Sequence, residues 1–206
     1  MTKIKICGIT NKTDALAAAE LGVDMLGFVF YGKSKRYVEA NTVRDISNEL
    51  PEKILRVGVF VDEERNRVLD IAADVSLDVL QFHGDETPEY CASFKDDYKV
   101  MKAFRIKDKT SLRRVNDYDT DYYLFDSYRK SSAGGTGEIF DWELLENFEV
   151  LKPFILSGGL DPDNVGKAIL EVAPYGVDVS SGVESSPGKK DIALLKKFVT
   201  NVRRLD

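Results

Sequence analysis

The chain has few of the residues that mark a disulfide-bonded, metal-binding or membrane-spanning protein. Its 206 residues include two cysteines, Cys7 and Cys91, far apart and without a CxxC pair, and one histidine, His83. Neither a disulfide framework nor a metal site with several histidine ligands is therefore expected. The apolar runs are too short to cross a bilayer, and no charged-then-apolar leader begins the chain. These absences predict a reduced, cytoplasmic protein.

The sequence also lacks an excess of basic charge. Its formal net charge is −6, and acidic and basic residues are mixed throughout. Nucleic acids and anionic membranes attract clusters of Lys and Arg, so neither is expected as a partner. Apolar residues make up 43% and charged residues 31% of the chain, as in soluble globular proteins. An anionic ligand would have to be held by local dipoles and a few placed cations.

Short runs rich in Val, Ile, Leu and Phe recur along the chain and predict strands. Segments with helical spacing separate them; one ends before Gly22, and another has Asp161 as its N-cap and Pro162 at its first helical position. We therefore predict a strand followed by a helix, eight times over. The strands are expected at 3–6, 23–30, 54–60, 77–82, 98–104, 121–125, 152–156 and 175–179.

This alternation, with no obvious hairpin turn, predicts parallel strands joined by right-handed crossovers. Eight such units favour a closed (β/α)₈ TIM barrel forming one domain over residues 1–206, with an open doubly wound sheet as the alternative. In a barrel, chemistry lies in the loops after the carboxyl ends of the strands. Those loops begin near Cys7, Phe30, Val61, His83, Phe104, Asp126, Ser157 and Ser180.

Glycine turns follow the last two predicted strands and suggest a phosphate site. Gly158 and Gly159 follow the seventh strand, and Ser181 and Gly182 follow the eighth. Glycines let backbone amides approach an anion closely, and amides at a helix start carry partial positive charge. Tight turns without a ligand are the alternative.

Two residues at strand ends are suited to proton transfer. Asp126 leaves an apolar strand, where desolvation raises a carboxyl pKa and keeps the group protonated as a general acid. Cys7 leaves the first strand, and a thiol acting as a base at neutral pH needs a pKa below its usual value of roughly 8.5. The alternatives are an aspartate that caps its loop and a cysteine that only fills space, as Cys91 is expected to do.

Further candidates lie in three other loops. Arg36 follows the second strand, where a guanidinium can hold a carboxylate through two hydrogen bonds, or can be a solvated charge. Gln81 and His83 end the fourth strand and offer hydrogen bonds or a titrating ring, unless His83 makes only a structural contact. The glycine-rich segment 131–142 suits a lid over a reaction, or a plain connection.

Together the motifs KICGIT, GFVF with SKRYV, LQFHGDE, LFDS, GGTGEIFDW, LSGGL and VDVSSGVE resemble the phosphoribosylanthranilate isomerase family, in order and over nearly the whole chain. The resemblance implies a (β/α)₈ barrel of tryptophan biosynthesis. It implies the Amadori rearrangement of N-(5-phosphoribosyl)anthranilate to 1-(2-carboxyphenylamino)-1-deoxyribulose 5-phosphate, with no cofactor and no metal. A small phosphosugar is then the expected partner. Independently of the resemblance, the charged outward faces of the expected helices, without an evident large apolar patch, favour a monomer over a homodimer.

The resemblance also implies roles for individual residues. Cys7 matches the family's general base and Asp126 its general acid, while Arg36 matches the residue that holds the anthranilate carboxylate. Gly158, Gly159, Ser181 and Gly182 fall in its phosphate-binding turns. Gln81, His83 and Asp178 are expected to line the substrate site, although Asp178 also suits a hydrogen-bonding role inside the barrel.

Two other readings stay open on sequence alone. Another phosphosugar barrel, such as an indole-forming synthase or an epimerase, would need a catalytic lysine and glutamate pair or metal-binding histidines at its strand ends. A catalytically silent sensor of a phosphorylated metabolite, or a structural partner of other enzymes, would need none of them. Turnover of the anthranilate substrate separates the isomerase from both.

Overall fold

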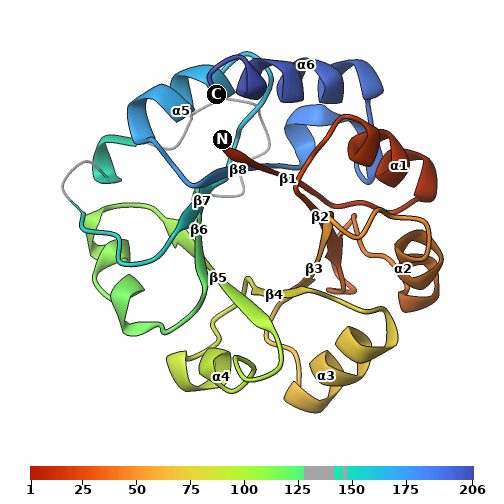
Figure 1. Cartoon of the computed structure of the whole chain (residues 1–206). Helices are drawn as coiled ribbons and strands as arrows, with labels where there is room; N and C mark the ends of the chain where they lie inside the picture. The colour runs from red at the N-terminus through yellow and green to blue at the C-terminus, as the bar shows by residue number, and fades with distance from the viewer. Residues whose placement is uncertain (128–141, 146–147) are drawn as a thin grey trace.

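The computed structural model describes residues 1–127, 142–145 and 148–206. Eight strands close into a barrel in the order β1-β2-β3-β4-β5-β6-β7-β8, so the predicted (β/α)₈ barrel is confirmed and the open sheet is excluded. Figure 1 looks along the barrel, with the ring of strands inside and the helices outside. The strands are β1 (Lys3–Cys7), β2 (Met25–Val29), β3 (Leu55–Phe60), β4 (Val79–Phe82), β5 (Lys99–Ile106), β6 (Tyr122–Ser127), β7 (Phe154–Leu156) and β8 (Gly176–Val179).

All neighbouring strands of the barrel are parallel, and β1 pairs with both β2 and β8. The carboxyl ends of the strands therefore meet at one rim. Side chains alternate between the two faces of a strand: in β1, Ile4 and Ile6 pack in the core that joins the barrel to its helices, which leaves Lys5 and Cys7 on the interior face. The floor of the interior is apolar and contains Met25, Val57, Val79, Met101, Ala103, Leu124 and Ile155.

The described residues form six α-helices, and these cover the outside of the barrel (Figure 1). The first begins after its N-cap Asn11, whose side chain accepts the amide of Asp14, and Gly22 follows its end with φ +77°. No helix within the described ranges is long and apolar enough to cross a membrane. The helices are α1 (Lys12–Glu20), α2 (Ala40–Ser47), α3 (Arg65–Asp74), α4 (Pro88–Ala92), α5 (Val165–Val172) and α6 (Ile192–Arg203).

The prediction of a helix after every strand is wrong for β5. Two short 3₁₀ turns, η1 (Lys109–Leu112) and η2 (Val115–Asp117), fill this connection. Leu112 and Val115 are its buried apolar residues, and the Asp108 side chain caps η1, so polar turn residues dominate the segment. After β6 the described residues form a 3₁₀ helix, η3 (Trp142–Leu145). The rest of the predicted lid, residues 131–141, lies outside the described residues.

Two local details near the rim also differ from the prediction. The helix after β7 begins at Val165, because the Asp161 side chain accepts the amides of Asp163 and Asn164 and forms a separate turn before it. Pro162 therefore lies in that turn rather than at the first helical position. After β8 the chain forms a small antiparallel hairpin, β9 (Glu184–Ser186) and β10 (Lys189–Lys190), around Gly188 with φ +81°. Its Pro-Gly pair is a hairpin signal that the sequence interpretation overlooked.

Candidate active site

A cavity of about 500 Å³ opens at the rim formed by the carboxyl ends of the strands. Strands β1, β5 and β6 contribute to its wall, as do the loops after β2, β3, β4, β7 and β8. Every site residue predicted from the sequence lines it, except Gly182. Those residues are Cys7, Arg36, Gln81, His83, Asp126, Gly158, Gly159, Asp178 and Ser181.

Cys7 ends β1 and lines the cavity, and Gly8 after it makes the turn that leaves room for Arg36. Gly8 has φ +77°, a left-handed conformation that glycine adopts without strain, and a Cβ there would lie 2.5 Å from Cδ of Arg36. Burial raises the pKa of the Cys7 thiol above its usual value, although the ammonium groups of Lys5 and Lys190 lower it. The depressed pKa expected from the sequence is therefore not what the structure gives, because desolvation outweighs the two cations.

Asp126 reaches the same cavity from β6 and is held by a chain of two side chains. Its Oδ2 lies 3.2 Å from Nε2 of His83, and Nδ1 of His83 lies 3.1 Å from Nε2 of Gln81. The amide nitrogen of Gln81 can only donate, so Nδ1 of His83 accepts and Nε2 carries the hydrogen that is donated to Asp126. The structure thus brings Gln81, His83 and Asp126 together in one directed chain.

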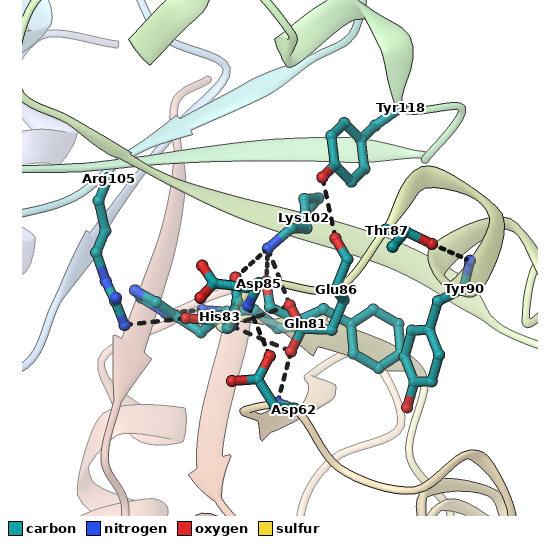
Figure 2. A network of polar contacts seen from close by, with 12 residues as sticks. Asp62, Gln81, His83, Asp85, Glu86, Thr87, Tyr90, Lys102, Arg105 and Tyr118 are labelled. Atoms are coloured by element: carbon teal, nitrogen blue, oxygen red, sulfur yellow. Dashed lines mark hydrogen bonds and ion pairs between the residues drawn. The ribbon is translucent and has the colours of Figure 1, made fainter.

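Glu86 anchors the loop that carries His83 (Figure 2). Its carboxylate accepts the backbone amides of Gly84 and Asp62, each at 3.0 Å, and pairs with Nζ of Lys102 at 2.9 Å. Lys102 also donates to the carbonyl oxygen of Gly84 at 2.8 Å. Both side chains of the ion pair are buried, and removing one partner of such a pair strands a charge in the interior. The loops after β3 and β4 are therefore tied to β5, which fixes His83 opposite Asp126.

Arg36 is held by a partner that the sequence did not suggest. Its Nε and Nη2 donate to Oε1 and Oε2 of Glu184 at 2.8 and 2.6 Å, the two-bond geometry of a guanidinium and a carboxylate. Burial works against ionisation of Glu184, but Arg36 and Lys190 together hold its pKa below the usual value. Glu184 occupies one edge of the guanidinium, which leaves the Nη1–Nη2 edge for a carboxylate of a ligand.

The wall of the cavity beside β7 and β8 consists of small residues. Gly158 and Gly159 have φ +85° and +75°, and Ser181 begins the short 3₁₀ helix η4 (Ser181–Val183). Oγ of Ser180 is buried and has no hydrogen-bond partner within the part of the chain that the structure describes. Left-handed glycines and turn amides are backbone features that bind phosphate groups.

Gly182 lies behind this wall. A Cβ at Gly182 would stand 2.0 Å from the carbonyl oxygen of Leu160 and 3.0 Å from Cα of Asp161. Real Cβ atoms do not approach backbone this closely, so glycine is needed for the contact between the loops after β7 and β8. The structure therefore gives Gly182 a place between the two loops rather than on the cavity surface.

Sequence reasoning missed the charged residues that support the site: Lys5, Glu86, Lys102, Glu184 and Lys190. A signal existed for two of them. Lys5 alternates with Ile in KIKIC and therefore shares the interior face with Cys7. Lys102 lies inside an apolar strand, which indicates that its side chain is buried. Glu184 and Lys190 lie in the hairpin after β8, where no periodic pattern shows which way a side chain points.

Comparisons with known proteins show the family and agree with this fold. A model of the family "N-(5'phosphoribosyl)anthranilate (PRA) isomerase" matches residues 4–201. The N-(5'-phosphoribosyl)anthranilate isomerase of Geobacter sp. (strain M21) is 49% identical over 205 residues, covering 100% of both chains.

Solved structures show the same likeness in three dimensions. The crystal structure of phosphoribosyl anthranilate isomerase from Thermotoga maritima has a TM-score of 0.91 and 44% identity, covering 99% of this chain and 100% of the other. A phosphoribosyl anthranilate isomerase in complex with reduced 1-(o-carboxyphenylamino)-1-deoxyribulose 5-phosphate has a TM-score of 0.88 and 42% identity, with the same coverage.

Proposed function

Since the chain belongs to the N-(5'-phosphoribosyl)anthranilate isomerase family, we propose that it carries out the family's aldose–ketose isomerisation with Cys7 as general base and Asp126 as general acid. The reaction is the Amadori rearrangement of N-(5'-phosphoribosyl)anthranilate to 1-(2-carboxyphenylamino)-1-deoxyribulose 5-phosphate in tryptophan biosynthesis. Its two proton transfers require a donor and an acceptor on one ribose at the same pH.

In the first step Asp126 protonates the oxygen of the furanose ring. The bond between that oxygen and sugar C1 breaks, and the anthranilate nitrogen supplies the electron pair of a C=N bond. Because Oδ2 of Asp126 accepts from His83, the acidic proton belongs on Oδ1. His83 therefore orients the donor, and Glu86 holds His83 in place.

In the second step the Cys7 thiolate removes the proton from sugar C2. The electrons of the C–H bond form a C1=C2 bond, and those of the C=N bond return to nitrogen. The resulting enolamine takes a proton at C1 and loses the hydroxyl proton at C2 to become the ketose. The observation that carries this proposal is that Cys7 and Asp126 line one cavity at the same rim of the barrel.

The rest of the cavity suits the two ends of this substrate. The free edge of the Arg36 guanidinium binds the anthranilate carboxylate, while Glu184 fixes the opposite edge. The phosphate binds the turn amides at Gly158, Gly159 and Ser181. Oε1 of Gln81, buried and without an acceptor role among the described residues, is available to a sugar hydroxyl.

Gly182→Ala is expected to raise KM about tenfold or more, with a smaller effect on kcat. The added methyl group would push the loops after β7 and β8 apart, and the phosphate they hold is remote from the reacting carbons. Steady-state kinetics on the anthranilate ribotide measure this. Gly32→Ala is the matched control, because a Cβ at Gly32 meets nothing within 4 Å, and its KM should stay at the wild-type value.

The proposed function is tested by mixing the purified protein with N-(5'-phosphoribosyl)anthranilate and following the loss of substrate fluorescence. Enzyme-dependent decay, with the ketose phosphate as product, is expected. A protein that binds the reduced product analogue but causes no decay would be a phosphosugar-binding protein without turnover, and the isomerase proposal would be wrong.

A further inference from the structure

Lys5 is a buried cation in the barrel interior, directly below the cavity. Its side chain is 1% exposed, and Nζ lies 3.0 Å from Oδ1 of Asp178 on β8. Oγ of Ser157 donates to the other carboxylate oxygen, Oδ2 of Asp178, at 3.1 Å. Burial disfavours a charged ammonium, but Asp178 and the Cys7 side chain more than offset this and raise the pKa of Lys5 above its usual value. Lys5 is therefore charged at neutral pH.

The hydrogen bonds of Lys5 are incomplete by comparison with the other buried lysines. Lys102 donates its three ammonium hydrogens to the carbonyl oxygens of Phe82 and Gly84 and to Glu86. Lys190 likewise has three acceptors, the carbonyl oxygens of Cys7 and Ser180 and the carboxylate of Glu184. An ammonium has three donors and loses stability when buried donors stay unpaired.

Within the described part of the chain, Lys5 makes one hydrogen bond to an oxygen acceptor, the one to Asp178. The group beside its remaining donors is the thiol of Cys7. Gly27, on the neighbouring strand, shows how close they are: a Cβ built on it would lie 2.9 Å from Sγ of Cys7 and 3.1 Å from Nζ of Lys5. Both atoms border the same small space, which exists because residue 27 is glycine.

The other charged groups that face Cys7 are already paired with residues other than Cys7. Lys190 and Arg36 both act on the thiol electrostatically, and both are paired with the carboxylate of Glu184, whose single charge balances one of the two cations. Asp178 opposes the thiolate but is itself paired with Lys5. Of the two buried ammonium groups that act on Cys7, Lys190 has three oxygen acceptors, whereas Lys5 has one among the described residues and keeps donors for the sulfur.

We propose that Lys5 is a positioning residue for the base, and that its ammonium stabilises the Cys7 thiolate by donating a hydrogen that Asp178 leaves free. The inference rests on the proposed function, in which the thiolate of Cys7 removes the sugar proton. It explains how the sulfur ionises although desolvation opposes its charge: the negative charge forms beside a cation that is already in place. Asp178 and Ser157 then hold the cation rather than the substrate.

The test is the pH dependence of Cys7 alkylation by iodoacetamide in the full-length protein, followed by peptide mass spectrometry to read Cys7 separately from Cys91. Alkylation follows the thiolate fraction, so its midpoint reports the thiol directly without turnover. In Lys5→Met the midpoint should rise by about one pH unit or more, which lowers the alkylation rate about tenfold below that midpoint. Wild type should titrate above the usual thiol range, because burial raises the pKa of Cys7.

Lys5→Met leaves Asp178 without its cation, so Lys5→Met/Asp178→Asn provides a variant without an unpaired buried charge. Its midpoint should also lie above wild type, because the Lys5 ammonium acts on the thiol more strongly than the Asp178 carboxylate. Lys102→Met/Glu86→Gln is the matched control, since it removes an equally buried ion pair that does not border Cys7, and its midpoint should stay unchanged.

An unchanged or lowered midpoint in the double variant at Lys5 and Asp178, or an equal shift in the control, would overturn the proposal. This failure is distinct from failure of the proposed function. If Cys7→Ala is inactive while the Lys5 variants show no shift, only the role of Lys5 is lost. If Cys7→Ala is fully active, the assignment of Cys7 as the general base is wrong, whatever the alkylation experiment shows.

Discussion

Cys7→Ala is expected to lower kcat by about 10²- to 10⁴-fold, the usual contribution of a positioned general base. Alanine cannot accept the proton from sugar C2, and no other described side chain at the end of β1 replaces the sulfur. Binding should change little, because the thiolate acts on the transition state while the carboxylate and phosphate of the substrate contact other loops. Steady-state fluorescence kinetics give kcat, and titration with the reduced product analogue gives the affinity.

The second cysteine of the chain provides the control. Cys91 is fully buried in α4 among the aromatic residues outside the barrel, and burial raises its thiol pKa to about 12. Cys91→Ala should therefore keep the wild-type kcat, with at most a modest loss of stability from the small cavity. Full activity in Cys7→Ala, with Cys91→Ala behaving normally, would remove the thiol from the mechanism.

The barrel was predictable because its signal is repeated. Each strand of a (β/α)₈ barrel is buried on both faces, so each appears in the sequence as an apolar run, and eight runs support one another. The same repeat predicted a helix after β5, where the structure has two 3₁₀ turns, because the repeat of strands does not specify the structure of each connection. This connection buries two apolar residues, Leu112 and Val115, and the polar residues before them, Asp108, Thr110 and Ser111, hydrogen-bond locally.

The residues of the site were predictable from their position at strand ends, whereas their partners were not. Arg36 was identified as a carboxylate-binding residue, yet its partner within the protein, Glu184, is separated from it by most of the chain. Such a pair depends on closure of the barrel, which brings the loops after β2 and β8 to either side of β1. Local spacing carries no information about a contact made only when the ring closes.

The buried lysines are a second case in which the sequence places a residue but does not show its partner. A lysine in a strand usually reaches solvent with its charged end. Lys5 and Lys102 do not, because Asp178 and Glu86 meet them inside the fold. The alternation of β1 places Lys5 on the face of Cys7, but only the structure shows that β8 supplies the carboxylate that makes burial possible.

Asp126→Asn is expected to lower kcat by about 10²- to 10⁴-fold, the effect of removing a general acid. Asparagine has nearly the same shape, and its Oδ1 can accept the hydrogen bond from Nε2 of His83 in place of the carboxylate. The amide, however, has no acidic proton to give to the furanose oxygen. Affinity for the reduced product analogue should remain near wild type, which shows that the cavity is intact.

A substrate deuterated at sugar C2 separates this defect from the loss of the base. In wild type, removal of the C2 proton by Cys7 should give a primary isotope effect on the single-turnover rate. In Asp126→Asn, ring opening precedes that step and becomes limiting, so the isotope effect should fall toward one. An undiminished isotope effect in a slow Asp126→Asn enzyme would mean that C2 proton removal still limits the rate. The carboxyl would then assist Cys7 rather than open the ring, and the acid would have to be sought elsewhere on the cavity wall.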